Sequence, residues 1–180
     1  MYQSQDDLQL ALKGLLADEY DLTANSANLC ALIYHELADL NWVGFYWLKD
    51  HELVLGAFQG KPACVRIAIG QGVCGTAAAM RTTQIVADVH EFPGHIACDA
   101  ASRSELVIPL LARDQLLGVL DLDSPIKNRF DDATVGLVSQ LARDWCTHQF
   151  CSPETHTHSH LTGRGTEGMF NFTAAILCSS

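Results

Sequence analysis

The sequence has 180 residues, 48% of them hydrophobic, and this size and composition predict one domain with a hydrophobic core. Its 21 acidic and 11 basic residues give a formal net charge of -10, which repels the phosphates of nucleic acids and anionic membrane surfaces. The N-terminus lacks the features of a secretory signal, and no apolar run approaches the roughly 20 residues of a membrane span. We therefore expect a cytoplasmic protein whose partners include neither nucleic acid nor a membrane.

Two amphipathic helices are predicted at the N-terminal end. Ser4 and Asp7 have the spacing of a capping box, and leucines at helical spacing follow as far as about Ala17. A second apolar stripe begins at Ser26 and recurs every three or four positions. Cys30 lies on this stripe and is predicted to be a core residue.

The middle of the chain is predicted to form strands. Segments rich in aromatic and branched residues, separated by turn residues, predict two hairpins with two further strands between them. The first hairpin comprises 41–48 and 52–60, the further strands are 64–70 and 84–89, and the second hairpin comprises 104–112 and 115–124. In the third strand, Val65, Ile67 and Ile69 alternate and should share one face. The glycines that follow lead into a short helix over residues 76–80, and a long loop over residues 90–103 precedes the second hairpin.

A closing helix is predicted from Asp131 to about Trp145, where apolar residues recur at helical spacing and acidic residues occupy the first turn. Helices at both ends of five or six mostly antiparallel strands predict an α+β domain over residues 1–150, with these helices packed on one sheet face. Residues 151–180 lose the periodicity and are predicted to be a poorly ordered tail.

The tail contains three alternating histidines, His156, His158 and His160. Such a run binds metal in some proteins, but without further ligands it is a weak signal, and we interpret it as part of a solvated tail.

Seven cysteines in a reducing compartment are of interest only where they serve catalysis, redox sensing or metal binding. Four of them lie on helix stripes or in the tail and are interpreted as small hydrophobic residues: Cys30, Cys146, Cys151 and Cys178. The other three lie at a strand edge, in a glycine-rich turn and in an acidic loop, where packing does not require sulfur: Cys64, Cys74 and Cys98. Their spacing does not match the closely paired ligands of structural zinc sites, so we expect no metal.

Local charge leaves the reactivity of these thiols open. Asp99 would raise the pKa of Cys98 if its carboxylate lay close, so activation of Cys98 has to come from the fold or the substrate. Cys74 lies where residues 72–76 enter a helix, and a helix N-terminus lowers a thiol pKa. A need for a small residue in tight packing explains Cys74 equally well.

Three acidic residues lie in otherwise apolar strands. Glu105 opens its strand, and Asp121 and Asp123 alternate with leucines, so both aspartates face the same side of theirs. Such carboxylates either bind a ligand or cap turns and face water. A cysteine, a glutamate and two aspartates together would suit a ligand with an ammonium group and an oxygen that needs a proton.

Five segments closely resemble the free methionine-(R)-sulfoxide reductases, which are stand-alone GAF domains. The segments are NWVGFYWL at 41–48, FQGKPACVRI at 58–67, GQGVCGTA at 70–77, DVHEFPGHIACDAASRSE at 88–105 and LGVLDLDS at 117–124. The resemblance covers about residues 20–146. It implies a GAF-like α+β fold with a sheet of about six strands, and reduction of free methionine-(R)-sulfoxide by thiols without a cofactor.

The resemblance also implies roles for the cysteines. Cys98 would attack the sulfoxide sulfur and become a sulfenic acid, while Glu105 would protonate the sulfoxide oxygen. Cys64 would resolve the sulfenic acid as a disulfide that thioredoxin reduces. Cys74 matches the third cysteine of the family, with a role left open.

Four further positions match the substrate pocket of the family. Asp121 and Asp123 would hold the amino group of free methionine sulfoxide, and Trp42 and Tyr46 would form an aromatic wall around its S-methyl group. The resemblance leads us to expect a homodimer. Two other functions stay open, a GAF-type small-molecule sensor without turnover and a redox sensor with a regulatory disulfide.

Overall fold

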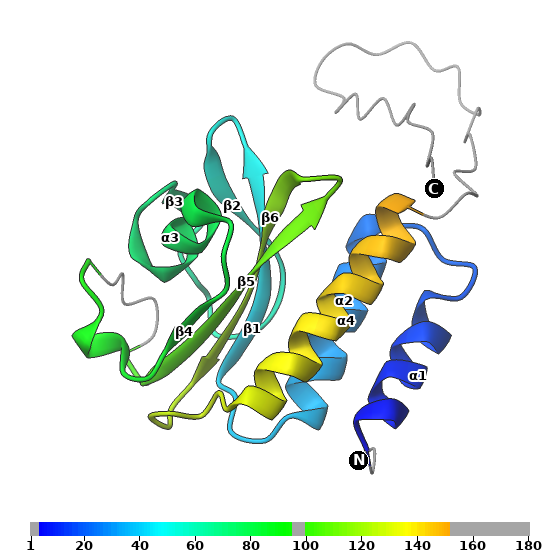
Figure 1. Cartoon of the computed structure of the whole chain (residues 1–180), viewed down its shortest axis with the longest axis horizontal. Coiled ribbons are helices and arrows are strands. Elements are labelled where there is room, and N and C mark those ends of the chain that lie inside the picture. Colours follow the sequence, from blue (N-terminus) through cyan, green and yellow to red (C-terminus); the bar gives the residue numbers. More distant parts are fainter. Residues whose placement is uncertain (1–3, 95–99, 152–180) are drawn as a thin grey trace.

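The computed structural model describes residues 4–94 and 100–151, and within them six strands form one sheet in the order β3-β2-β1-β6-β5-β4 (Figure 1). Each neighbouring pair is antiparallel. The strands are β1 (Trp42–Lys49), β2 (Glu52–Gly60), β3 (Arg66–Ala68), β4 (Gln84–Val86), β5 (Ser104–Ala112) and β6 (Gln115–Ser124). Both predicted hairpins are present, because β1 pairs with β2 and β5 pairs with β6.

Three helices lie on one side of the sheet, as the sequence predicted (Figure 1). They are α1 (Gln5–Leu16), α2 (Leu22–Glu36) and α4 (Asp132–Cys151). Two of them pack on the face of the sheet, and the N-terminal helix packs against those two. The Ser4 side chain caps α1 by accepting a hydrogen bond from the Asp7 backbone N–H at 3.2 Å. Helix α2 begins earlier than the apolar stripe indicated, because Asp21 caps it through the Ala24 N–H at 2.7 Å and its first turn is not part of the stripe.

The large core lies between these helices and the sheet. Trp145 of α4 packs against Phe45 and Trp47 of β1, with ring centroids 4.9 and 5.8 Å away. Cys30 and Cys146 are buried in this core, which confirms their prediction as hydrophobic residues. The layer of helices therefore provides the rigid support for the opposite face of the sheet.

The opposite face carries a second, smaller apolar cluster beneath the short helix α3 (Gly72–Met80). This helix begins four residues earlier than predicted, so the glycines around Cys74 belong to the helix and do not merely precede it. A Cβ atom on Gly75 would lie 2.4 Å from the Ala68 carbonyl oxygen. Gly75 is thus required for close packing of α3 against the chain before it.

The third predicted strand is shorter than its alternation suggested. The regular strand that pairs with β2 is Arg66–Ala68, and Ile67 is buried whereas Val65 is 63% exposed. The expectation that Val65 shares the buried face is wrong, because Val65 precedes the regular strand at the edge of the sheet. Among the described residues, no helix has the length and apolar character needed to cross a membrane.

Candidate active site

A pocket opens on the α3 side of the sheet, between the helix and strands β1, β5 and β6. Its walls come from segments that are far apart in the sequence. They include Trp42, Tyr46, residues 61–63, Ile67, residues 71–74, Ser102, Glu105, Asp121 and Asp123. Six of the eight residues predicted for the site are among them.

Strand register brings the acidic residues together. Asp123 of β6 lies opposite Trp42 of β1 on one side and opposite Glu105 of β5 on the other. Asp121 lies two positions earlier on β6 and therefore faces the same side of the sheet. Both aspartates line the pocket, which confirms the prediction that they share one face. Like charges directly opposite one another are unfavourable, so this arrangement favours a cationic ligand or a proton.

The aromatic wall is formed by Trp42 and Tyr46, whose rings stack with centroids 5.8 Å apart. The Trp42 Nε1–H donates to the Lys61 carbonyl oxygen at 3.0 Å, and the Tyr46 hydroxyl donates to the Cys64 carbonyl oxygen at 3.0 Å. A Cβ atom on Gly44 would lie 2.3 Å from the Trp42 ring. Glycine at this position therefore leaves the space that the tryptophan ring occupies.

Cys74, Glu105 and Asp121 meet at the base of the pocket. The Cys74 Sγ lies 4.0 Å from the Glu105 Oε1, and one donor atom from each of the three residues lies within 4.8 Å of the other two. All three side chains are buried. Among the described residues, the Asp121 Oδ1 has no hydrogen-bond partner. An unpaired buried carboxylate oxygen is costly, so this atom is suited to bind a ligand.

Burial dominates the electrostatics of this group. It raises the pKa of Glu105 well above its usual value, and the charges of Asp121 and Asp123 raise it further. Burial raises the pKa of Asp121 to about 7, although a hydrogen bond from Cys74 opposes the rise. A carboxyl group that stays protonated near neutral pH is able to act as a general acid.

The thiol of Cys74 behaves differently from the expectation based on its helix. Burial raises its pKa well above the usual value, and the charges of Asp121 and Glu105 raise it further. Of the two explanations that the sequence left open for Cys74, burial and these charges favour a small packed residue over a thiol activated by the helix. Local sequence carried no sign of this, because the two carboxylates come from β5 and β6.

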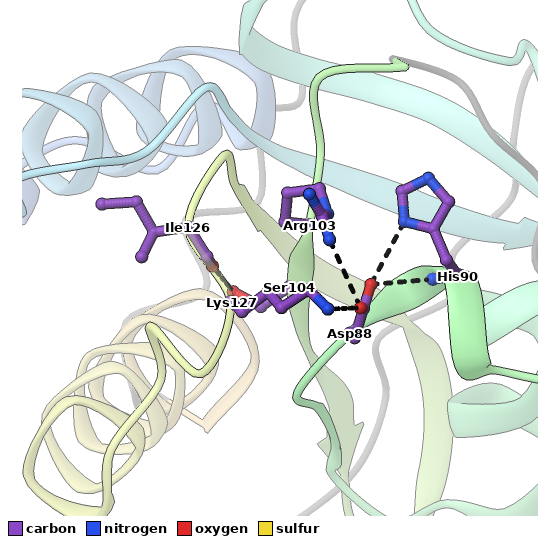
Figure 2. A network of polar contacts seen from close by, with 6 residues as sticks. All are labelled: Asp88, His90, Arg103, Ser104, Ile126 and Lys127. Carbon is purple, nitrogen blue, oxygen red and sulfur yellow. Dashed lines mark hydrogen bonds and ion pairs between the residues drawn. The ribbon is translucent and has the colours of Figure 1, made fainter.

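A polar cluster around Asp88 was not foreseen from the sequence (Figure 2). The Asp88 carboxylate pairs with Lys127 and with Arg103 Nη2 at 3.4 Å, and lies 3.1 Å from His90 Nδ1. The Val89 N–H donates to the Arg103 carbonyl oxygen at 2.8 Å. These contacts join the start of the segment between β4 and β5, at Asp88, to its end at Arg103. The pair with Lys127 connects both to the chain after β6. Because Arg103 is two residues before Glu105, the cluster holds the start of β5.

Two of the predicted residues differ from the other six. Cys64 is half-buried and follows the wall residues 61–63, but it is not among the residues that line the pocket. Cys98 lies outside the described residues, as do His156, His158, His160 and Cys178. Ser102 was not predicted as a wall residue; its Oγ accepts a hydrogen bond from Asn41 Nδ2 at 3.0 Å. The segment CDAAS contained Ser102, but only the resemblance would have drawn attention to it.

Comparison with known proteins agrees with this geometry. The GAF domain family matches residues 21–144. The free methionine-R-sulfoxide reductase of Escherichia coli is 56% identical over 126 residues, which cover 70% of this chain and 76% of that protein. The fRMsr of Staphylococcus aureus in complex with substrate is 46% identical with a TM-score of 0.78, over 83% of this chain and 97% of that one. The free methionine-R-sulfoxide reductase of Neisseria meningitidis in complex with its substrate is 39% identical with a TM-score of 0.77, over 81% of this chain and 87% of that one.

The sheet order, the helices on one face and the pocket on the other are thus those of a GAF domain, and the match spans both hairpins and most of α4. Within that class, the chain belongs to the free methionine-R-sulfoxide reductases, which are oxidoreductases.

Proposed function

We propose that this protein reduces free methionine-(R)-sulfoxide to methionine, with Cys98 as the nucleophile and thioredoxin as the final reductant. The observation that supports this most strongly is the pocket in which buried Glu105 and Asp121 face the aromatic rings of Trp42 and Tyr46. Relatives that share the fold have been solved with their substrate bound.

The pocket suits the two ends of a small zwitterion. The ammonium group of the substrate would donate hydrogen bonds to Asp121 and Asp123. It would thereby provide the hydrogen-bond partner that the Asp121 Oδ1 lacks. The S-methyl group would lie against Trp42 and Tyr46, because sulfur and methyl groups pack favourably on aromatic rings. A blocked amino group would remove the charge that the aspartates bind.

The reaction proceeds by transfer of the sulfoxide oxygen. The Cys98 thiolate attacks the sulfoxide sulfur, and Glu105 supplies the proton to the oxygen as the sulfur–oxygen bond weakens. The new sulfur–sulfur bond then breaks as the oxygen passes to Cys98, so that Cys98 is oxidised to a sulfenic acid, the substrate sulfur is reduced and methionine leaves. The raised pKa of Glu105 supports this role, because burial and the neighbouring charges of Asp121 and Asp123 favour the protonated carboxyl group.

The second half of the cycle restores the thiol. Cys64 condenses with the sulfenic acid, which releases water and forms a disulfide. Thioredoxin then reduces the disulfide by thiol exchange. The half-exposed position of Cys64 supports this assignment over Cys74, which is buried beside carboxylates that disfavour its thiolate.

The test is release of methionine from free methionine-(R)-sulfoxide by the full chain with thioredoxin, thioredoxin reductase and NADPH. A parallel arm with dithiothreitol separates the chemistry at Cys98 from the choice of reductant. The (S) epimer and N-acetyl methionine sulfoxide should both be poor substrates. A protein that binds the (R) epimer without releasing methionine in either arm would be a sensor, and equal turnover of the N-acetyl compound would refute the ammonium site.

A further inference from the structure

We propose that Cys74, Glu105 and Asp121 form a binding site for a thiophilic divalent cation such as Zn²⁺, and that the bound cation excludes the substrate. The site itself stands on the geometry, and only its inhibitory consequence rests on the proposed function. The expectation of no metal rested on the spacing of cysteines along the chain, whereas these three ligands come from distant segments.

The three donors converge from three elements of structure. Cys74 is on α3, Glu105 on β5 and Asp121 on β6, and one donor atom from each lies within 4.8 Å of the others. Zinc binds sulfur at about 2.3 Å and carboxylate oxygen at about 2.0–2.2 Å, so two tetrahedral ligands lie roughly 3.5 Å apart. The Cys74 Sγ and the Glu105 Oε1 are 4.0 Å apart. Small side-chain rotations would bring these donors onto one ion.

A separate observation indicates that this position favours a positively charged ligand. Asp121 is only 6% exposed, lines the pocket, and its Oδ1 is without a hydrogen-bond partner in the described part of the chain. Two buried carboxylates and a thiol within a few ångströms repel one another when ionised. A divalent cation would relieve this repulsion directly, and would displace the thiol proton to solvent as it binds.

The donor set selects the kind of cation. Magnesium and calcium prefer oxygen ligands only, whereas zinc accepts thiolate together with carboxylate. Three protein ligands facing an open pocket leave a fourth position for water. The substrate ammonium would use the carboxylates but not the thiol. The thiol is therefore the group that distinguishes a cation site from the ammonium site.

Binding of the cation and of the substrate is mutually exclusive, because both need Asp121 and because a metal-bound Glu105 has no proton to donate. Zinc should therefore raise the apparent KM for methionine sulfoxide without lowering kcat. Chelation should restore the original kinetics.

The direct test measures the binding of Co²⁺, used in place of Zn²⁺, by absorption spectroscopy. A thiolate bound to cobalt gives a charge-transfer absorption in the near ultraviolet. The full chain carrying Cys98→Ser is used in its reduced form, so that substrate is bound but not converted. We expect one cobalt per chain, the absorption band, and loss of the band on adding Zn²⁺ or saturating methionine-(R)-sulfoxide. The substitution Cys74→Ser should abolish the band and weaken zinc binding by at least about tenfold, since loss of even outer partners of a metal changes affinity by about 10–100-fold.

Two controls exclude two other groups of the chain that could bind the metal. Cys151→Ser removes a half-buried thiol at the end of α4, and replacement of His156, His158 and His160 by glutamine removes the histidine run. Both should leave the band unchanged. A band that survives Cys74→Ser, persists with saturating substrate or disappears with the histidines would overturn the inference. Turnover without a band would reject the cation site alone, whereas a band without turnover in the wild type would reject the proposed function alone.

Discussion

Replacing Asp121 by asparagine should stabilise the protein while it weakens substrate binding. Burial raises the pKa of Asp121 from 3.8 to about 7, and each pKa unit corresponds to about 1.4 kcal/mol. At pH values above the folded pKa, the ionised Asp121 therefore lowers the free energy of unfolding by on the order of 4 kcal/mol. Asparagine has the same shape but no charge to bury, so Asp121→Asn removes this cost.

The sign of the effect depends on pH in a defined way. Between the unfolded and folded pKa values, only the folded state holds the proton, so the stability of the wild type falls as pH rises. The stabilisation by Asp121→Asn should be absent below about pH 4, grow between about pH 4 and 7, and stay constant above that. Urea unfolding of the reduced proteins with a chelator, at both ends of this range, measures the difference.

The same substitution should raise the KM for methionine sulfoxide by about 10–150-fold, because a hydrogen bond to a charged group is worth about 1.5–3 kcal/mol. Asp50→Asn is the matched control. Asp50 is exposed in the β1–β2 turn, where its φ of 47° suits asparagine equally well, and neither stability nor KM should change. If Asp121→Asn were no more stabilising at high pH than at low pH, the burial of an ionised Asp121 would be refuted.

Three further substitutions test other parts of the site. Glu105→Gln should lower kcat by about 10²–10⁴-fold in steady-state assays, which is the usual contribution of general acid catalysis. An unchanged kcat would show that Glu105 is not the general acid. Cys98→Ser should release no methionine in rapid-quench experiments, whereas Cys64→Ser should release about one equivalent per site and then stall with thioredoxin; a burst from Cys98→Ser with none from Cys64→Ser would reverse the two roles. Asp88→Asn should lower the free energy of unfolding at neutral pH, because the cations around Asp88 hold its pKa well below the usual range. That loss should shrink as pH falls below about 4, where the unfolded carboxyl group is already protonated, and in high salt; an equal loss in acid would show that Asp88 does not act through its charge.

Much of this protein was determined by short-range patterns in its sequence. Apolar spacing of three or four identified the terminal helices, and alternation on β6 placed Asp121 and Asp123 on one face, because both patterns follow directly from backbone geometry. Cys30 was predicted to be buried for the same reason, and the structure confirms it. The family resemblance rested on runs of neighbouring residues and was likewise readable without a structure.

Only the tertiary structure decided the environment of each functional group. Cys74 was adjacent to glycines and a helix start in the sequence, yet burial raises its pKa, and the charges of Asp121 and Glu105, which reach it from two other elements, raise it further. The cluster at Asp88 joins residues that are up to 39 positions apart, such as Lys127. Burial and charge depend on strand order and packing between distant segments, and a pKa responds to every charge within a few ångströms. Local patterns report which way a side chain points, but the fold determines what it meets there.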